Sequence, residues 1–256
     1  MKPLISIITV VRNCESHIEQ TIKSVIDQTY KPIEYIIIDG NSTDKTVDII
    51  KKYEGKLSHW ISESDKGIYD AMNKGIALSS GEWINFLNAG DYFYSKQTLD
   101  TIFSTDLSFF DVIYGDSVIV YDNFFQQKKA GPFNKLWTGM IFSHQSMFIK
   151  SNLQKQNPYN IHNLIGADFE MIYGLYHYHY AFNYLQLPIS CIRTGGVSDI
   201  NRMECVKTNY KTVKKYRSDF QTILFYVFFA GNQLLKLFFK KILSKKIQDM
   251  IILSRA

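Results

Sequence analysis

The chain has 256 residues, of which 46% are hydrophobic and 21% charged. This length and composition predict a globular protein with one large domain, or one domain with an appendage. Its three cysteines are scattered, without a C-x-x-C pair or a Cys/His cluster, which argues against a disulfide framework or a structural zinc site. Reduced thiols, and a short N-terminal apolar run interrupted at Arg12, predict a cytoplasmic protein that begins with a strand and not with a signal peptide.

The net charge of +5 is unevenly distributed along the chain. Residues 201–256 carry a net charge of +9, whereas residues 1–200 carry −4. A slightly acidic body with a basic tail indicates an anionic partner for the tail, either membrane lipid or nucleic acid.

Strands and helices are predicted to alternate over the first ninety residues. Apolar runs predict strands at residues 4–11, 33–40, 59–62 and 83–87, and the helical spacing of apolar residues between them predicts three helices. This alternation indicates an α/β fold with a mostly parallel central sheet flanked by helices. Ligands of such sheets lie beyond the carboxyl ends of the strands. The segment Thr9 to Asn13, Asp39 and Asp91 are all expected at that edge.

The middle of the chain is predicted to contain more strands, and the end a helical extension. Strands are expected at residues 111–122, 145–151 and 182–194, with a helix in GADFEMIYGLYHY, residues 166–178. The composition changes near residue 200, so we expect a domain over residues 1–200 and a basic, apolar helical tail over residues 201–256.

The tail mixes apolar and basic residues from Asp219 onward. Its apolar run is too interrupted for a clean membrane span, and its composition is typical of an amphipathic helix that lies in a membrane surface. The alternatives are a helix packed on its own domain or on a second copy of the chain, and a spanning helix.

Four stretches taken together resemble the family 2 glycosyltransferases of the GT-A fold. They are SIITVVRN (6–13), QTYKPIEYIIIDGNSTDKT (28–46), ESDKGIYDAMNKGIALSSGEWINFLNAGD (63–91) and HQSMFIK (144–150). The segment DKGIYDAMNKG and the later GGVS (195–198) are similar to the bacterial branch that builds surface polysaccharides. The resemblance covers residues 4–200 in order, so it is more specific than any single short motif.

The resemblance implies an inverting glycosyltransferase of the hexosyltransferase type, which moves a sugar from a nucleotide-diphosphate donor to an acceptor hydroxyl. A UDP-sugar is the first expectation for the donor and a lipid-linked glycan for the acceptor. Asp39 is expected to accept from the nucleotide base, and Asp65 to lie beside the ribose and diphosphate. The full set expected to bind the nucleotide sugar is Thr9, Val11, Asn13, Asp39, Asp65, Lys66, Gly67, Asn88, Ala89, Gly90 and His144.

Asp91 is the expected metal ligand. A departing nucleoside diphosphate gains negative charge, and Mg²⁺ or Mn²⁺ can offset that charge while bound to hard oxygen ligands. The family usually has two acids in a D-x-D pattern here, whereas this chain has NAGD, so Asn88 brings no charge. The alternative is that Asp91 only stabilises the turn. We expect an exposed side chain that contributes little to stability.

Asp168 is the residue that the resemblance implies as the base that takes the acceptor's proton. Glu170 is the second candidate, although two residues along a helix it points in another direction. Asp168 could instead cap the helix. His144 and Gln145 precede a strand and are expected near the acceptor or the donor sugar, with a structural role for His144 as the alternative.

A cytoplasmic enzyme held peripherally on the inner face of the membrane is therefore the leading hypothesis, because an anionic leaflet would attract the basic tail. A nucleotidyltransferase and an inactive sugar-nucleotide-binding protein of the same fold are the alternatives. A nucleic-acid partner is not expected, because Phe and Leu lie between the tail lysines in place of a face suited to base stacking.

Overall fold

The computed structural model describes residues 2–196, 200–243 and 247. Val197 and Ser198 of the GGVS motif lie outside the described residues, as do residues 244–246 and 248–256 of the predicted tail. For residues 240 and 241 only the backbone is described.

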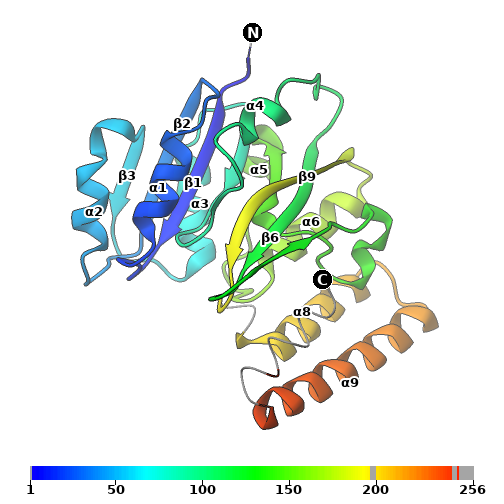
Figure 1. Cartoon of the computed structure of the whole chain (residues 1–256). Helices are drawn as coiled ribbons and strands as arrows, with labels where there is room; N and C mark the ends of the chain where they lie inside the picture. The colour runs from blue at the N-terminus through cyan, green and yellow to red at the C-terminus, as the bar shows by residue number, and fades with distance from the viewer. Residues whose placement is uncertain (1, 197–199, 244–246, 248–256) are drawn as a thin grey trace.

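A single large sheet runs through the molecule in the order β3-β2-β1-β4-β8-β6-β9-β5, with β7 paired to β6 (Figure 1). Its strands are β1 (Ile5–Val11), β2 (Ile33–Asp39), β3 (His59–Ser62), β4 (Trp83–Phe86), β5 (Tyr92–Phe93), β6 (Val112–Val120), β7 (Phe125–Lys128), β8 (Met147–Lys150) and β9 (Phe182–Arg193).

The sheet is parallel in its first half and mixed in its second. Strands β3, β2, β1 and β4 are all parallel, as the alternation of strands and helices predicted. Strand β8 is antiparallel to both β4 and β6, and β9 is parallel to β6. Between β6 and β8 the chain returns through β7 and two short 3₁₀ turns and not through a crossover helix, so β8 enters the sheet in the opposite direction.

Helices cover both faces of this sheet (Figure 1). The α-helices are α1 (Ile18–Ile26), α2 (Thr46–Lys52), α3 (Ile68–Leu78), α4 (Thr98–Ile102), α5 (Ser151–Gln156), α6 (Ala167–His177), α8 (Arg202–Lys214) and α9 (Phe220–Ile242). The 3₁₀ turns are η1 (Glu54–Lys56), η2 (Phe133–Thr138) and η3 (His144–Ser146).

Strand β1 is buried along its whole length, and its alternate side chains enter two different cores. Ile5 and Ile7 join the core that α1, α2 and α4 cover, whereas Ile8 and Val10 join the core beneath α3, α5 and α6. Side chains of successive strand residues point to opposite faces, and each fully buried isoleucine contributes on the order of 1.5–3 kcal/mol. This two-sided burial explains why the run from Ile5 to Val11 has so few polar residues.

The two C-terminal helices dock on the side of the sheet that α6 covers. Helix α8 packs on α6, and α9 packs on α8 and η2. The Tyr226 hydroxyl donates to the carbonyl of Trp137 at 3.2 Å, and the Arg217 guanidinium lies 4.4 Å from the centre of the Trp137 ring. The described part of the predicted tail is therefore helical, and it is anchored to the domain.

Candidate functional site

The turn that joins β4 to β5 brings NAGD, residues 88–91, beside the end of β1. The backbone N–H of Ala89 donates to the carbonyl of Val10 at 3.2 Å. Gly90 has a φ of 98°, a left-handed conformation that favours glycine. Its N–H donates to the hydroxyl oxygen of Thr21 at 3.0 Å, and that hydroxyl donates to the carbonyl of Asp91 at 2.7 Å. Helix α1 thereby fixes the turn at the carboxyl edge of the sheet.

Asp91 is buried and not exposed as the sequence suggested, because only 7% of the residue is accessible to solvent. Its Oδ2 accepts from Nε2 of Gln145 at 2.8 Å, and its Oδ1 accepts from the backbone N–H of Arg193 at 3.1 Å. These bonds tie the turn to η3 and to the end of β9. The expected exposure of Asp91 is therefore wrong, and with it the reason for expecting little contribution to stability.

Burial also changes the pKa of Asp91, the predicted metal ligand. Burial raises the pKa of Asp91 to about 6, and the bonds from Gln145 and Arg193 oppose part of the rise. In the described part of the chain, no three His, Cys, Asp or Glu side chains are grouped to hold a metal ion. Each Asp91 oxygen keeps a second lone pair, and Oδ1 of Asn88 is buried without a hydrogen-bond partner. One carboxylate and one amide oxygen fit a hard cation whose remaining ligands come from a diphosphate and water.

The end of β1 contributes less to a ligand surface than predicted. Thr9 is completely buried, and its hydroxyl donates to the carbonyl of Leu87 at 2.7 Å and lies 3.1 Å from the Tyr35 hydroxyl. Val11 is also buried. We therefore correct the role expected of the Thr9 side chain, which has no surface with which to line a nucleotide pocket, whereas Val11 keeps 6% of its surface and its contact with a nucleotide stays a prediction. The hydroxyl of Thr9 instead joins neighbouring strands beneath the edge.

Asn13 and Asp39 shape the loops at this edge. Oδ1 of Asn13 accepts from the N–H of Thr43 at 2.8 Å. The carboxylate of Asp39 accepts from the N–H and hydroxyl of Ser42 and from the hydroxyl of Ser62. Asp39 is fully buried, so a contact with a nucleotide base stays a prediction that would have to use a remaining lone pair of this carboxylate.

The segment Asp65 to Gly67 lies against the end of β2. A Cβ atom on Gly40 would overlap Oδ2 of Asp65, so any side chain at this position would force that carboxylate to move. Oδ1 of Asp65 accepts from the N–H of Gly67 at 2.9 Å, and Gly67, with a φ of 119°, directly precedes the first residue of α3. Lys66 is exposed between them. The structure thus brings Asn13, Asp39 and the segment of residues 65–67, which are all predicted to bind the donor, to one edge of the sheet.

His144 links the NAGD turn to Asp168. Nδ1 of His144 lies 3.3 Å from Oδ2 of Asp168, and Nε2 lies 3.1 Å from Nδ2 of Asn88. Because the amide nitrogen can only donate, we assign Nε2 as the acceptor and Nδ1 as the nitrogen that carries the proton toward Asp168. His144 therefore contacts the predicted base directly, a contact that the sequence did not indicate.

The carboxylate of Asp168 is held on both sides. Its Oδ1 accepts from the Tyr69 hydroxyl at 2.9 Å, opposite the bond from His144 to Oδ2. Burial alone would raise the pKa of Asp168, but the hydrogen bonds from His144 and Tyr69 hold it below its usual value. Because its pKa is lowered, the carboxylate is ionised at neutral pH, and because 18% of the side chain is exposed, it is still reachable from solvent.

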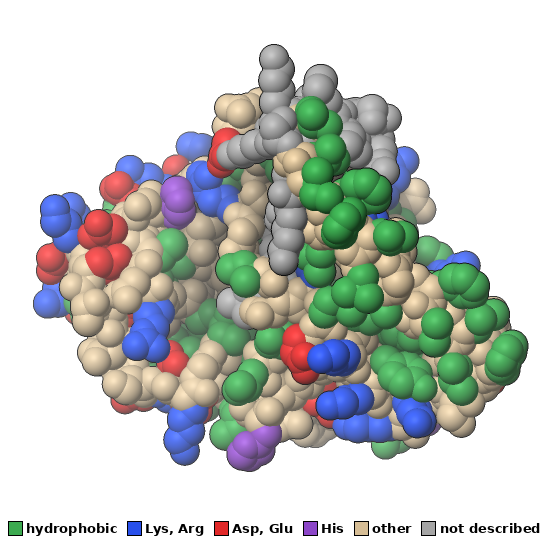
Figure 2. Space-filling model, turned by 90° about the horizontal axis from the view of Figure 1, so that it is seen from below, with side chains coloured by type: hydrophobic (Ala, Val, Ile, Leu, Met, Phe, Trp, Pro, Cys, Tyr) green, Lys and Arg blue, Asp and Glu red, His purple; other side chains and the backbone are tan. Residues whose placement is uncertain are grey.

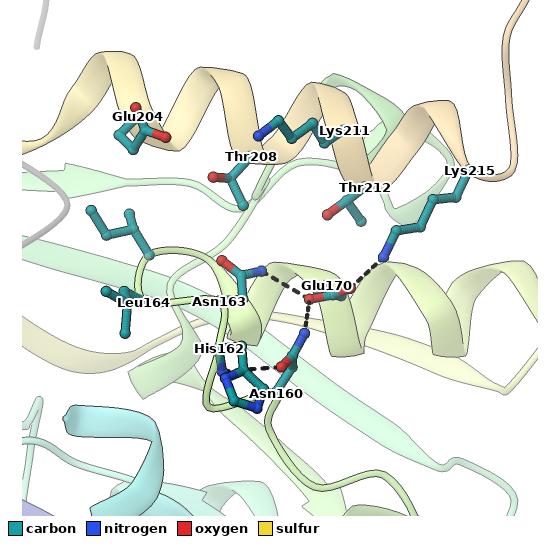
Figure 3. A pocket seen from close by; sticks show the side chains of 11 residues that line it. Asn160, His162, Asn163, Leu164, Glu170, Glu204, Thr208, Lys211, Thr212 and Lys215 are labelled. Carbon is teal, nitrogen blue, oxygen red and sulfur yellow. Dashed lines mark hydrogen bonds and ion pairs between the residues drawn. The ribbon is translucent and has the colours of Figure 1, made fainter. Parts of the chain in front are cut away.

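Glu170 faces away from this cluster, toward a separate pocket between α8 and the loop before α6 (Figure 3). Its carboxylate accepts from Asn160, Asn163 and Lys215, and burial, which raises its pKa, is outweighed by these bonds. The pocket has a volume of about 460 Å³. The direction of the Glu170 side chain disfavours it as the base, because it points away from the side of the α6 N-terminus where Asp168 contacts His144.

The sequence did not indicate the hydrogen bonds by which four further residues hold the site together. Gln145 and Arg193 hold Asp91, and Tyr69 and Asn73 hold the segment before α6. Tyr69 and Asn73 stand in the DKGIYDAMNKG motif, four residues apart. This spacing predicts a shared helix face, but not which segment that face contacts.

The chain matches known proteins over most of its length. The model of the family described as Glycosyl transferase family 2 matches residues 6–172. A PGL/p-HBAD biosynthesis glycosyltransferase of Mycobacterium bovis BCG is 32% identical over 174 residues, which are 66% of this chain and 68% of that protein. The Escherichia coli UDP-Glc:alpha-D-GlcNAc-diphosphoundecaprenol beta-1,3-glucosyltransferase WfaP is 38% identical over 100 residues, which are 39% of this chain and 40% of WfaP.

Solved structures share the fold at low sequence identity. S. aureus TarS 1-349 in complex with UDP has a TM-score of 0.68 and 17% identity, over 98% of this chain and 78% of that one. The Pyrobaculum calidifontis mannosyltransferase PcManGT, in complex with GDP-Man and Mn²⁺, has a TM-score of 0.67 and 15% identity, over 90% of this chain and 70% of that one. Against the longer TarS chain the match spans 41% of its length. The chain therefore belongs to glycosyl transferase family 2: it is a nucleotide-sugar glycosyltransferase of the GT-A fold, with relatives in the synthesis of bacterial surface glycans.

Proposed function

We propose that this enzyme transfers one sugar, with inversion, from a UDP-sugar to a hydroxyl of a lipid-linked glycan acceptor. The observation that carries the proposal is the ionised carboxylate of Asp168. It lies in contact with His144, which in turn contacts Asn88 of the NAGD turn. The lowered pKa keeps this carboxylate ionised at neutral pH, so it has a free lone pair with which to accept a proton next to the predicted donor edge.

The proposed reaction is a direct displacement with Asp168 as the base. The acceptor oxygen attacks the anomeric carbon of the donor sugar as its proton passes to Asp168. The bond from that carbon to the diphosphate oxygen breaks, and the nucleoside diphosphate leaves with the electron pair. His144 and Tyr69 each bond one oxygen of the carboxylate and so would fix its orientation during the proton transfer. Attack on the face opposite the leaving group inverts the anomeric carbon.

Asn88 and Asp91 are the residues that would hold a divalent cation together with the diphosphate oxygens. Mg²⁺ or Mn²⁺ would supply positive charge to the leaving diphosphate. The buried, unpartnered Oδ1 of Asn88 supports this proposal. The solved relative PcManGT contains Mn²⁺.

The choice of substrates rests on the relatives. WfaP is named for a UDP-glucose donor and a diphosphoundecaprenol-linked acceptor. TarS 1-349 has been solved with UDP and with UDP-GlcNAc. We infer a UDP-sugar donor and a lipid diphosphate acceptor for this chain by that similarity.

Ligand binding and hydrolysis test the proposal together. Thermal shifts are measured with UDP, GDP, UDP-glucose, UDP-GlcNAc and GDP-mannose, each with and without Mn²⁺, because a ligand that binds the native state raises the melting temperature. We expect stabilisation by UDP compounds. We also expect Asp168→Asn to bind them normally while hydrolysing the donor at least a hundredfold more slowly, within the range of general-base effects. An Asp168→Asn enzyme as fast as the wild type would refute the assignment of the base.

Helix α9 supports a second proposal, that the enzyme lies on an anionic membrane. Thr222, Tyr226 and Gln233 are buried against the body, so about 16 Å of the helix is docked along the protein at 1.5 Å per residue. The opposite face is exposed and apolar, as Figure 2 shows along this helix. It is formed by Phe220, Ile223, Leu224, Val227, Phe228, Leu234, Leu235, Phe238, Phe239 and Ile242.

The docking of α9 favours a helix that lies in the membrane surface. Contrary to the expectation that the apolar run is too interrupted for a span, the stretch Phe220–Phe239 is long and apolar enough to cross a membrane, and only 17% of it is buried in the protein. A helix fixed along one side to a folded domain cannot also be surrounded by lipid. Its outer apolar face can enter the interface, while the excess of basic residues after residue 200 attracts anionic headgroups.

Vesicle sedimentation tests this location with a matched pair of variants. Phe228→Glu with Phe238→Glu places two charges on the outer face of α9, whereas Phe109→Glu with Phe125→Glu does so on exposed phenylalanines of the body. We expect the first double variant alone to lose binding to phosphatidylcholine–phosphatidylglycerol vesicles. Equal sedimentation of both variants would contradict the proposal, and a loss of dimer mass in light scattering would assign the face to a second copy of the chain.

A further inference from the structure

Helix α3 presents Tyr69 and Asn73 to the segment that leads into α6. The two side chains are four residues apart and so lie on one face of the helix. Both contact residues more than eighty positions further along the chain. Neither contact is needed for α3 to form, since the helix already buries Met72 and Ile76 against the sheet.

The hydroxyl of Tyr69 is used in two directions. It accepts from the backbone N–H of Gly166 at 3.0 Å and donates to Oδ1 of Asp168 at 2.9 Å. An N–H can only donate and an ionised carboxylate can only accept, so the direction of both bonds is fixed. Gly166 precedes the first residue of α6 and has a φ of 105°. Tyr69 therefore fixes both the start of α6 and the orientation of its carboxylate.

Asn73 fixes the other end of the same segment. Its Nδ2 donates to the carbonyl of Tyr159 at 2.9 Å, and its Oδ1 accepts from the N–H of Tyr159 at 2.9 Å. The rings of Tyr159 and Tyr69 lie 5.4 Å apart. Residues 159–166 are thus held at both ends by one turn of α3.

The helix that makes these contacts is itself fixed at the carboxyl edge. Gly75 allows α3 to pack closely on Ile8 of β1, because a Cβ there would overlap that side chain. At its other end, α3 is preceded by Gly67, which lies two residues after Asp65, and the carboxylate of Asp65 lies next to Gly40. The helix connects the proposed donor-binding segment to Tyr69 within one turn.

We propose that Tyr69 is a positioning residue for the base Asp168, supported by Asn73, so that α3 couples the donor-binding segment to the carboxylate that takes the acceptor's proton. This inference rests on the proposed function, because it requires Asp168 to be the base. Without the Tyr69 hydroxyl, the N–H of Gly166 and the carboxylate of Asp168 each lose a partner, and the carboxylate is left with His144 and the backbone N–H of Phe169. Small displacements of a catalytic group cost on the order of a hundredfold in rate.

The experiment compares Tyr69→Phe with Tyr30→Phe in the full chain. Tyr30 is fully buried in the opposite core, and its hydroxyl donates to the carbonyl of Pro3 at 2.6 Å, so its removal also costs one buried hydrogen bond, far from the base. The readouts are the thermal shift with UDP, and the rate of hydrolysis, across pH, of the nucleotide sugar that stabilises the wild type most. Hydrolysis is used because water then takes the place of the acceptor.

We expect Tyr69→Phe to keep the UDP-induced shift while its kcat falls about 10- to 100-fold, and Tyr30→Phe to keep its kcat. The acid limb of the Tyr69→Phe profile should move to higher pH, because the lost donor had lowered the pKa of Asp168. Asn73→Ala should lower kcat in the same direction. A kcat within twofold of the wild type, an unmoved acid limb, or a loss of UDP binding in Tyr69→Phe would overturn the inference. Failure of the wild type to bind any nucleotide sugar would instead refute the proposed function.

Discussion

Replacing Asp91 by alanine should destabilise the fold as well as disturb any bound cation. The carboxylate accepts one hydrogen bond from Gln145 and one from the backbone of Arg193, and it lies almost wholly away from solvent. Alanine leaves both donors in place without an acceptor. The change therefore acts on three segments at once, namely the β4–β5 turn, η3 and the end of β9.

The size of the effect follows from these two orphaned donors. A buried donor without a partner costs about 1–3 kcal/mol, so two cost about 2–6 kcal/mol. Burial of the charge opposes this loss, because it raises the pKa of Asp91 to about 6 and so makes the ionised form less favourable at neutral pH. We expect a net destabilisation of about 2–4 kcal/mol. At roughly 2–4 °C per kcal/mol for a chain of this size, the melting temperature should fall by about 5–15 °C.

Urea unfolding and thermal melting, both in EDTA, measure this effect without a contribution from bound metal. Gln145→Leu is the companion variant, since it removes one of the two donors and leaves the carboxylate bonded only to the backbone of Arg193. In the double variant of Asp91 and Gln145 the two losses should not add, because each single change already breaks the shared bond. A melting temperature for Asp91→Ala within about 1 °C of the wild type would show that the carboxylate is not bonded as the structure has it.

Two further changes test the scaffold around the site. Glu34 is buried and accepts from two serine residues, and these bonds outweigh burial and lower its pKa; Glu34→Gln should therefore cost about 1–3 kcal/mol in urea unfolding at neutral pH. This difference should shrink as the pH falls below the unfolded value of 4.5 and through the folded pKa, and an identical difference at both pH values would contradict the reasoning. Gly40→Ala should displace Asp65 and weaken UDP binding about tenfold, as measured by calorimetry. Gly55→Ala is the control, because the space around Gly55 is open and its affinity for UDP should not change. Equal affinities in the two variants would show that Asp65 does not contribute to the donor site.

Much of the fold could be predicted because hydrophobic patterning is local. The strand His59–Ser62 was predicted with the bounds that the structure has, and β1, β2 and β4 to within one residue at each end. These strands are buried on both faces and alternate with helices, so their composition leaves little ambiguity. The short elements β5, β7, α4 and α5 were not predicted, since two to six residues carry too little pattern to distinguish them from loops.

The candidate site was predicted unevenly, for a physical reason that Asp91 and Asp168 illustrate. The sequence placed both acids correctly at the ends of elements, because a strand end and a helix start are local features. It could not tell that Asp91 is buried, because the residues that cover it, Gln145 and Arg193, lie 54 and 102 positions away. For the same reason it assigned a ligand-facing role to Thr9, whose hydroxyl is enclosed between strands.

By itself, the sequence determined the parallel half of the sheet, the family, and which carboxylates lie near the carboxyl edge, since each depends on residues close together in the chain. Only the tertiary structure decided what each carboxylate faces. Asp168 points to Tyr69 and His144, and Glu170, two residues later, points to α8. Their hydrogen bonds join residues far apart in sequence, and they exist only after the helices have packed on the sheet.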